Sequence, residues 1–312
     1  MNNKKTFQIM THIMPWEIDY CLILFDTLSR SKKNTSHRYN IDVALNLSSY
    51  IINWKQSQLD KEFFIEKIQS YIKLLEGFDL VNLTVYDGDA NYGHLDLQRD
   101  VIKPENDYYI SITPDQLFDT SMLYYFEQSV LNITETNFLV TAEIPKFWDT
   151  SWDVISNSHF NYLPPDTKGY DFLSINRYDA LNIPATLPIN LIKLNQIKFA
   201  GWLDLYSKNF YENIAPVPST WCGYGQWDLY AMTIAHHINQ SNIPIEISQY
   251  KLENGVTISI EYSNWNYGEN RSIYKSRLAL NDIPDQREKF NLELNQVITK
   301  QIHEIYEEYQ KQ

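Results

Sequence analysis

Strand-like and helix-like segments alternate along the first half of this chain, and that order constrains its fold more than any other feature. Apolar strand-like runs cover residues 6–14, 41–47, 80–86, 107–113 and 137–143, and segments with helical spacing cover 17–31, 61–75, 93–103 and 120–131. Strands that alternate with helices join a common sheet through right-handed crossovers. The sequence therefore predicts an α/β fold with a mixed, mostly parallel sheet flanked by helices.

The second half of the chain is less regular. Residues 145–188 show no period, and long irregular stretches of this kind are usually functional or mobile. Order returns with a strand at 198–207, a helix at 228–238 and strand-like segments at 245–252 and 256–262. A charged helix at 285–312 follows as a C-terminal tail. With no repeat and no flexible linker, residues 1–284 are expected to form one domain.

Composition excludes several classes of function. The chain has 26 basic and 39 acidic residues, a formal net charge of -13, which disfavours binding to nucleic acid phosphates. Its two cysteines, Cys21 and Cys222, lack a metal-ligand spacing, so we expect a reducing, cytoplasmic location. No signal peptide is visible, and no segment approaches the roughly 20 apolar residues of a transmembrane helix.

Charged residues of both signs are expected at one edge of the sheet. The segment 93–103 opens with a glycine and carries Arg99, and the strand at 107–113 runs into Thr113-Pro114-Asp115. Open α/β sheets bind ligands at the carboxyl ends of their strands, and arginine pairs well with phosphate oxygens. A cation and an acid at this edge predict a site for a nucleotide and a metal.

The order of several short motifs resembles that of GT-A glycosyltransferases, most closely the family-2 group. The motifs are Met14-Pro15-Trp16, Asn46-Leu47-Ser48, Gln98-Arg99-Asp100, Thr113-Pro114-Asp115, the strand Gly201–Tyr206 and the turn Gly223–Leu229. The likeness covers about residues 5 to 240. It implies a GT-A (Rossmann-like) fold with a nucleotide-binding half at 1–119 and an acceptor half at 120–284.

The resemblance also implies an activity. A sugar would pass from a nucleotide-diphosphate sugar, such as a UDP-sugar, to a hydroxyl acceptor on a glycan, a lipid or another molecule. Asp115 would bind Mn²⁺ or Mg²⁺, Arg99 would lie over the diphosphate, and Asp228 would act as the base. Each residue has a plainer alternative: Asp115 and Asp228 as helix caps, and Arg99 in an ion pair with Asp96 or Asp100.

Further positions follow from the same resemblance. Thr11 and Glu17 are expected to contact the uracil or ribose, although Glu17 is as well explained by the dipole of the helix that it precedes. Asn46 stands where the family often reads the base. Thr113 replaces the first acid of the Asp-x-Asp motif, so its hydroxyl would bind ribose or coordinate metal weakly. His237 is a candidate metal ligand, with the alternative that it and its neighbour lie on different helix faces.

A second class of function stays open. Thr113 and Gln226 stand where the family has acids, and this favours a catalytically silent GT-A-like module that binds a nucleotide or a glycan.

Overall fold

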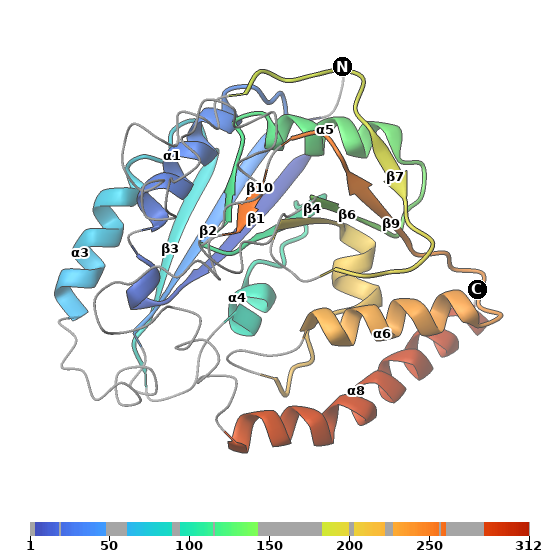
Figure 1. Ribbon diagram of the computed structural model, residues 1–312. Coiled ribbons are helices and arrows are strands. Elements are labelled where there is room, and N and C mark those ends of the chain that lie inside the picture. Colours follow the sequence, from blue (N-terminus) through green and yellow to red (C-terminus); the bar gives the residue numbers. More distant parts are fainter. Residues whose placement is uncertain are drawn as a thin grey trace, which may run out of the picture.

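A computed structural model describes residues 4–18, 20–47, 61–88, 94–114, 116–142, 183–199, 203–221, 227–255, 257–259 and 284–311. Its centre is one eight-stranded sheet with the order β3-β2-β1-β4-β8-β6-β9-β7 (Figure 1). The strands are β1 Thr6–Ile13, β2 Arg38–Asn46, β3 Leu80–Tyr86, β4 Tyr108–Ile112, β6 Phe138–Ala142, β7 Leu191–Lys193, β8 Leu203–Ser207 and β9 Ser248–Leu252. A separate antiparallel pair joins β5 Gln116–Phe118 to β10 Thr257–Ser259.

Most strands of the large sheet run in one direction. β1 is parallel to both β2 and β4, β2 is parallel to β3, and β6 is parallel to β9. β8 is antiparallel to β4 and β6, and β7 is antiparallel to β9. This mixed, mostly parallel sheet confirms the predicted fold class and is consistent with a GT-A (Rossmann-like) fold.

Helices cover both faces of the sheet (Figure 1). On one face, which we call the α1 face, lie α1 Tyr20–Lys32, α3 Lys61–Ile72 and α5 Met122–Asn132. On the other, the α6 face, lie α4 His94–Asp100, α6 Trp227–Gln240 and the C-terminal helix α8 Pro284–Gln310. The short helices are η1 Pro15–Glu17 and the π-helix η6 Phe210–Ile214. Among the helices that the structure describes, none is long and apolar enough to cross a membrane.

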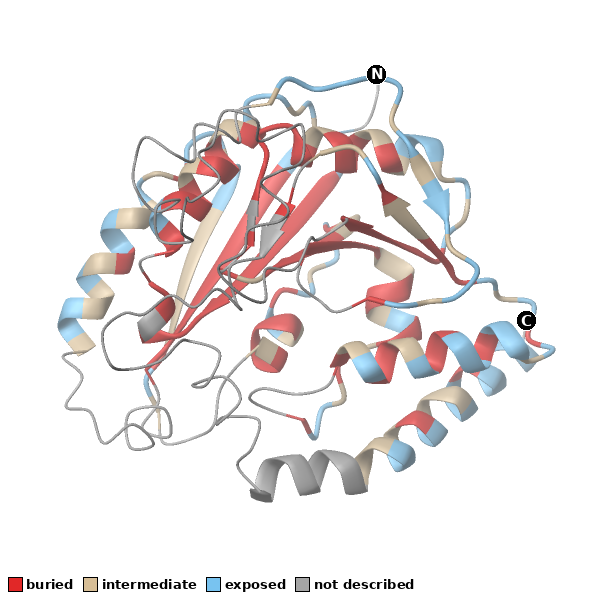
Figure 2. Ribbon diagram, in the orientation of Figure 1, coloured by how far each residue is buried: buried red, intermediate tan, exposed pale blue. Residues whose placement is uncertain are grey.

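The central strands β1, β2, β4, β6 and β8 are almost entirely buried, as Figure 2 shows, because helices cover each side, whereas the edge strands β3 and β7 are partly exposed. Successive strand residues point to opposite faces, so Ile9 and Ile13 of β1 join the aliphatic core of the α1 face while Met10 joins the core of the α6 face. The second core is unusually aromatic. Tyr206 of β8 meets Trp227 edge to face, with ring centroids 5.2 Å apart. The high aromatic content therefore fills this layer.

The structure alters several predicted elements. The strand predicted at 198–207 is limited to β8, and the helix predicted at 93–103 ends at Asp100 in α4. The strands β5 and β7 and the π-helix η6 were not predicted. The reversed direction of β8 was not predicted either, because apolar alternation carries no information about which way a strand runs.

Candidate functional site

The order of the strands reverses between β1 and β4. The chain moves from β1 to β2 and β3 on one side, and then returns to place β4 on the other side of β1. Open α/β sheets bind their ligands outside the carboxyl ends of strands at such a switch point. Here η1, which carries Glu17, follows β1, and Thr113 follows β4. Two of the predicted binding residues therefore stand where the topology favours a ligand.

A row of polar residues crosses the α6 face beside this point. We call it the polar strip, and each member is buried. Side chains two residues apart on a strand point to the same face, so the neighbours of these residues in the α6-face core place them on that face. The polar strip has one residue from each of five strands: His12, Ser111, Asp204, Thr141 and Gln249. Buried polar groups are costly unless they have partners, so polar residues gathered inside a sheet layer indicate a functional role.

Asp204 lies at the centre of the polar strip. In the β-ladder it is paired with Ser111 of β4 on one side and with Thr141 of β6 on the other. Its Oδ2 accepts a hydrogen bond of 3.2 Å from the hydroxyl of Tyr206, two residues along the same strand. Burial and then the charge of Asp204 raise the pKa of Tyr206 well above its usual value, with smaller contributions from Tyr211 and Asp228. The charge of Asp228 therefore makes a small contribution to the raised pKa of the Tyr206 hydroxyl, which donates to Asp204.

Asp228 lies in the first turn of α6, one residue after the helix begins at Trp227. Asp228 is therefore the second helical residue and not the N-cap, which would precede Trp227. Its Oδ1 accepts a hydrogen bond of 2.9 Å from the Leu229 N–H. Burial raises the pKa of the Asp228 carboxyl, and this hydrogen bond offsets part of the shift. A carboxylate with a raised pKa is a stronger base and suits proton abstraction.

Substitution of Tyr206 tests whether its hydrogen bond to Asp204 contributes to the site. Tyr206→Phe removes the hydrogen bond that the Tyr206 hydroxyl donates to Asp204 and so removes a restraint on the rotation of that carboxylate. We expect weaker binding of a ligand that contacts Asp204, while the aromatic ring keeps its contact with Trp227. Binding equal to that of the original chain, measured beside Tyr250→Phe as a control on β9, would exclude a link between this hydroxyl and the site.

Arg99 is bound within the protein. Its Nη2 pairs with Asp96 Oδ1 at 2.6 Å, one turn earlier on α4. Its Nη1 donates to the carbonyl oxygen of Pro218 at 3.0 Å and to that of Trp221. For Arg99 the sequence left open a contact with the diphosphate or an ion pair with Asp96 or Asp100, and the structure shows the ion pair with Asp96. Arg99 also fixes the loop that leads from η6 towards α6 and Asp228.

The predicted nucleotide contacts are divided between the two faces. Thr11 points to the α1 face with Ile9 and Ile13, away from Asp204 and Asp228. Asn46 ends β2 and is fully buried. Glu17 is also buried, and its Oε2 accepts a 2.9 Å hydrogen bond from Met14 N–H, which supports the helix-start alternative.

Among the described residues near the switch point, two side chains besides Thr11 have buried polar atoms without a hydrogen-bond partner. One is the Thr113 hydroxyl, directly after β4. The other is the amide of Gln98 on α4, which is 1% exposed. The backbone carbonyl of Gln98 accepts a hydrogen bond from Tyr211, so α4 is held against η6. A water molecule or a bound ligand completes the bonding of buried donors and acceptors of this kind.

Of the two predicted metal ligands, the structure describes only His237. Asp115 lies outside the described residues. Its alternative role as a helix cap is filled by Asp119, whose Oδ1 accepts a 2.7 Å hydrogen bond from Ser121 N–H just before α5. His237 is exposed, nine residues beyond Asp228 on α6, and that spacing puts the two on opposite sides of the helix. No three His, Cys, Asp or Glu side chains in the described part of the chain are grouped to hold a metal ion.

Two tryptophans belong to the motifs of the resemblance, Trp202 in the strand Gly201–Tyr206 and Trp227 in the turn Gly223–Leu229. Trp227 is a core residue, with Nε1 donating to the Ala215 carbonyl at 2.9 Å. Trp202 and Gln226 lie outside the described residues.

Sequence reasoning missed His12, Ser111 and Gln98 as site residues, and it quoted Asp204 only as part of a motif. The available signal was a polar residue flanked by apolar ones inside a strand, as in Leu203-Asp204-Leu205. That pattern also describes a strand with one solvated face. Only the helices packed on the α6 face show that these residues are buried.

Comparison with known proteins adds distant structural likenesses. No protein-family model matches the sequence, and no curated protein matches it. S. aureus TarS 1-349 aligns over 80% of this chain and 60% of its own, at 10% identity and a TM-score of 0.42. The same fragment in complex with UDP aligns over 79% of this chain and 60% of its own, at 10% identity and a TM-score of 0.43. WbbM, described as a bifunctional glycosyltransferase, aligns over 46% of this chain and 24% of its own, at 11% identity and a TM-score of 0.28. This chain therefore spans less than two thirds of each of these three structures.

Proposed function

We propose that this protein transfers a sugar from a nucleoside-diphosphate sugar to a hydroxyl acceptor, at the carboxyl edge of the sheet on its α6 face. One observation carries the proposal. Asp204, paired with Ser111 near the end of β4, is a buried carboxylate that accepts a hydrogen bond from Tyr206, and Asp228 lies in the first turn of the helix that packs on the same face. Carboxylates on this face near a topological switch point supply acid–base chemistry to a ligand bound there.

Asp228 is the proposed base. The acceptor hydroxyl gives its proton to the Asp228 carboxylate while the acceptor oxygen forms a bond to the anomeric carbon. The bond between that carbon and the diphosphate oxygen breaks, and its electron pair leaves with the nucleoside diphosphate. The raised pKa of Asp228 strengthens it as a base, and the start of α6 favours its ionised form before the transfer. Asp204, held by Tyr206, would orient the sugar through its hydroxyls.

The donor nucleotide would lie at the ends of β1, β2 and β4, where Glu17, Asn46, Thr113 and the amide of Gln98 stand. The unpartnered Thr113 hydroxyl and Gln98 amide are the features that support a bound polar molecule here. We propose Asp115 and Thr113 as the residues that would hold Mg²⁺ or Mn²⁺, which when bound neutralises charge on the departing diphosphate. His237 faces away from Asp228, so we leave it out of this site.

The proposal is tested by release of nucleotide. Purified protein incubated with UDP- and GDP-sugars is expected to release UDP or GDP slowly, since water replaces the missing acceptor, and faster when a hydroxyl acceptor is added. Binding of a nucleotide sugar with no release, with or without Mn²⁺, would instead support the silent binding module. Neither binding nor release would contradict both.

A further inference from the structure

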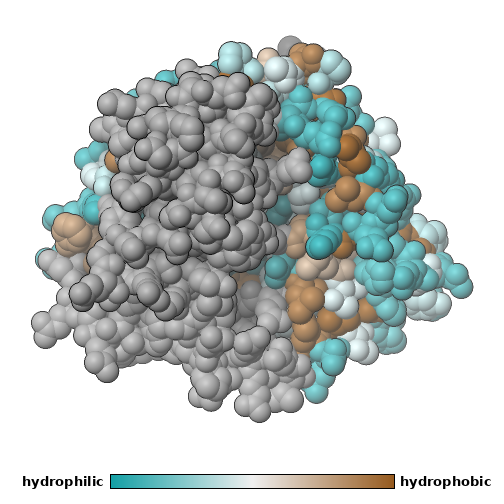
Figure 3. Space-filling view, in the orientation of Figure 1, coloured by the Kyte–Doolittle hydropathy of each residue, from teal (hydrophilic) through white to brown (hydrophobic). Residues whose placement is uncertain are grey.

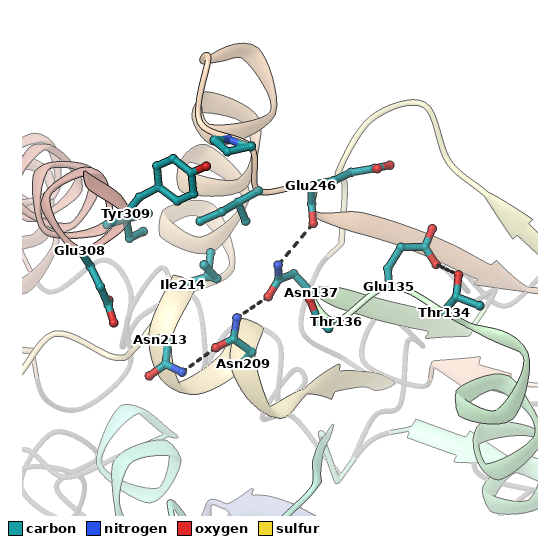
Figure 4. Close-up of a pocket in the computed structure, with 13 residues that line it drawn as sticks. Thr134, Glu135, Thr136, Asn137, Asn209, Asn213, Ile214, Glu246, Glu308 and Tyr309 are labelled. Carbon is teal, nitrogen blue, oxygen red and sulfur yellow. Dashed lines mark hydrogen bonds between the residues drawn. The ribbon is translucent and has the colours of Figure 1, made fainter. Parts of the chain in front are cut away.

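A second pocket lies at the opposite, amino-terminal edge of the sheet. Residues 134–137 and 244–246, which precede β6 and β9, form one side of it, and η6 and the end of α8 form the other (Figure 4). Its volume is about 580 Å³, within the range of about 300–1,000 Å³ typical of small-molecule sites. The proposed transfer reaction uses none of its residues.

Three asparagines form a directed chain along one wall. Asn213 donates from Nδ2 to Asn209 Oδ1 at 2.6 Å, Asn209 donates to Asn137, and Asn137 donates to the Glu246 carbonyl at 3.5 Å (Figure 4). An amide has two donor hydrogens and two acceptor lone pairs. The Asn213 Oδ1 at the head of the chain accepts nothing within the described residues, so the array offers an open acceptor beside further donor hydrogens.

The wall that carries two of these amides is a π-helix. In η6 the Ala215 N–H donates to the Phe210 carbonyl five residues earlier, at 2.9 Å. π-helices are rare and are found frequently at functional sites. Asn209 directly precedes η6 and Asn213 lies within it, and the two side chains are in direct contact. The π-helix is an observation on the backbone, independent of the pocket's shape.

The floor is apolar and the opposite wall is fixed. Ile214, Ile245 and Ile305 belong to the core of the α6 face. Gln301 of α8 donates from Nε2 to the carbonyls of Asn213 and Ile214 at 2.9 and 3.3 Å, so α8 is held against η6. The pocket is therefore formed before any ligand arrives. Over this side of the molecule as a whole, hydrophilic and hydrophobic side chains intermingle on the described surface (Figure 3).

The charge of the pocket argues against an anionic ligand. Glu135 and Glu246 both pair with Lys193, at 2.8 and 2.7 Å. The hydrogen bonds from Lys193 and then from Tyr250 lower the pKa of Glu135 to about 2, so it stays ionised. Glu308 forms no ion pair or side-chain hydrogen bond with the described residues and adds a further negative charge to the lining, which also contains Tyr309, 38% exposed. A net negative rim repels phosphates and acidic sugars.

We propose that this pocket binds an uncharged saccharide, with one or two sugar rings inside it. Sugar hydroxyls donate and accept like the amides of Asn209 and Asn213, and Glu308 accepts a further hydroxyl. The exposed ring of Tyr309 and the isoleucine floor match the C–H faces of a pyranose. The site is separate from the proposed donor site, since it lies at the other edge of the sheet, and it holds even if the chain transfers no sugar.

The test is saturation-transfer NMR on the full chain with cellobiose, maltose, lactose and chitobiose, and with a uronic-acid disaccharide as an anionic probe. At least one neutral disaccharide is expected to bind, and Asn213→Ala and Tyr309→Ala are each expected to weaken its binding by about tenfold. Asn295→Ala and Tyr306→Ala are matched controls, because both side chains are exposed on α8 outside the pocket. They are expected to bind like the original chain.

Asp228→Asn separates this site from the other. It is expected to leave disaccharide binding unchanged, whatever it does to sugar transfer. The proposal is overturned if no neutral disaccharide binds, if the acidic disaccharide binds more strongly, or if Asn213→Ala and Tyr309→Ala both bind like their controls.

Discussion

Asp228→Asn is expected to slow sugar transfer by about 10²- to 10⁴-fold, the usual contribution of a positioned general base. The substitution keeps the size of the side chain and its acceptor for the Leu229 N–H, so binding of the donor should persist. Initial rates of nucleotide release with an acceptor, together with calorimetric binding of the donor, measure both quantities. Asp26→Asn, in an ion pair with Arg30 on the α1 face, is the matched control and should retain full activity.

The same substitution has an expected effect on stability that depends on pH. Because burial raises the pKa of Asp228 in the folded state, the folded protein binds this proton more tightly than the unfolded chain does. The ionised carboxylate therefore costs stability at neutral pH, and the cost disappears as the pH falls below the pKa of the unfolded chain. Asp228→Asn should unfold at the same or a higher temperature at pH 7, with the difference vanishing in acid. A clear loss of stability at pH 7 would assign Asp228 a structural role.

Arg99→Ala is expected to destabilise the fold by about 2 kcal/mol or more, since it removes a charged donor from buried partners. Asp96 loses its ion pair, and the carbonyls of Pro218 and Trp221 lose their donor. Urea unfolding measures the loss. Arg99→Lys should recover only part of it, because a lysine lacks the planar fork that reaches three acceptors at once.

Arg30 of α1, on the α1 face of the sheet, is the control for the Arg99 substitution. Arg30→Ala removes an exposed i,i+4 pair with Asp26 and should cost under about 1 kcal/mol. If Arg99→Ala keeps the stability of the original chain and weakens only nucleotide binding, then Arg99 serves the diphosphate and not the loop, as the resemblance to glycosyltransferases implies.

The parallel half of the sheet was predictable because each of its strands is followed by an amphipathic helix. β1, β3 and β4 fall within the predicted runs, β2 overlaps its run but begins three residues earlier at Arg38, and helices α1, α3 and α5 fall between or after the strands. Pairing directions beyond β4 were not predictable. β8 enters the sheet from a distant segment and inserts antiparallel between β4 and β6, a long-range contact that leaves no local periodicity in the sequence.

The candidate site was predictable only in its outline. Acids at the end of β4 and in the turn before α6 follow from the motif order, and the structure places Asp228 in the first turn of α6, on the side of the sheet where Tyr206 donates to Asp204. The direction of Thr11 was not predicted, because a single residue in a fully buried strand does not reveal which face it joins. The loop contacts of Arg99 depend on carbonyls more than a hundred residues away, and no spacing in the sequence indicates them.

Binding of a nucleoside-diphosphate sugar tests the central claim most directly. Thermal unfolding with UDP- and GDP-sugars, each with Mn²⁺ and with EDTA, is expected to show a higher midpoint for at least one donor, because a ligand of the folded state stabilises it by mass action. Thr113→Val and Gln98→Leu, which remove the two unpartnered polar groups near the switch point, should reduce that shift. If no donor raises the midpoint under either condition, the proposed donor site at the ends of β1 and β4 is contradicted.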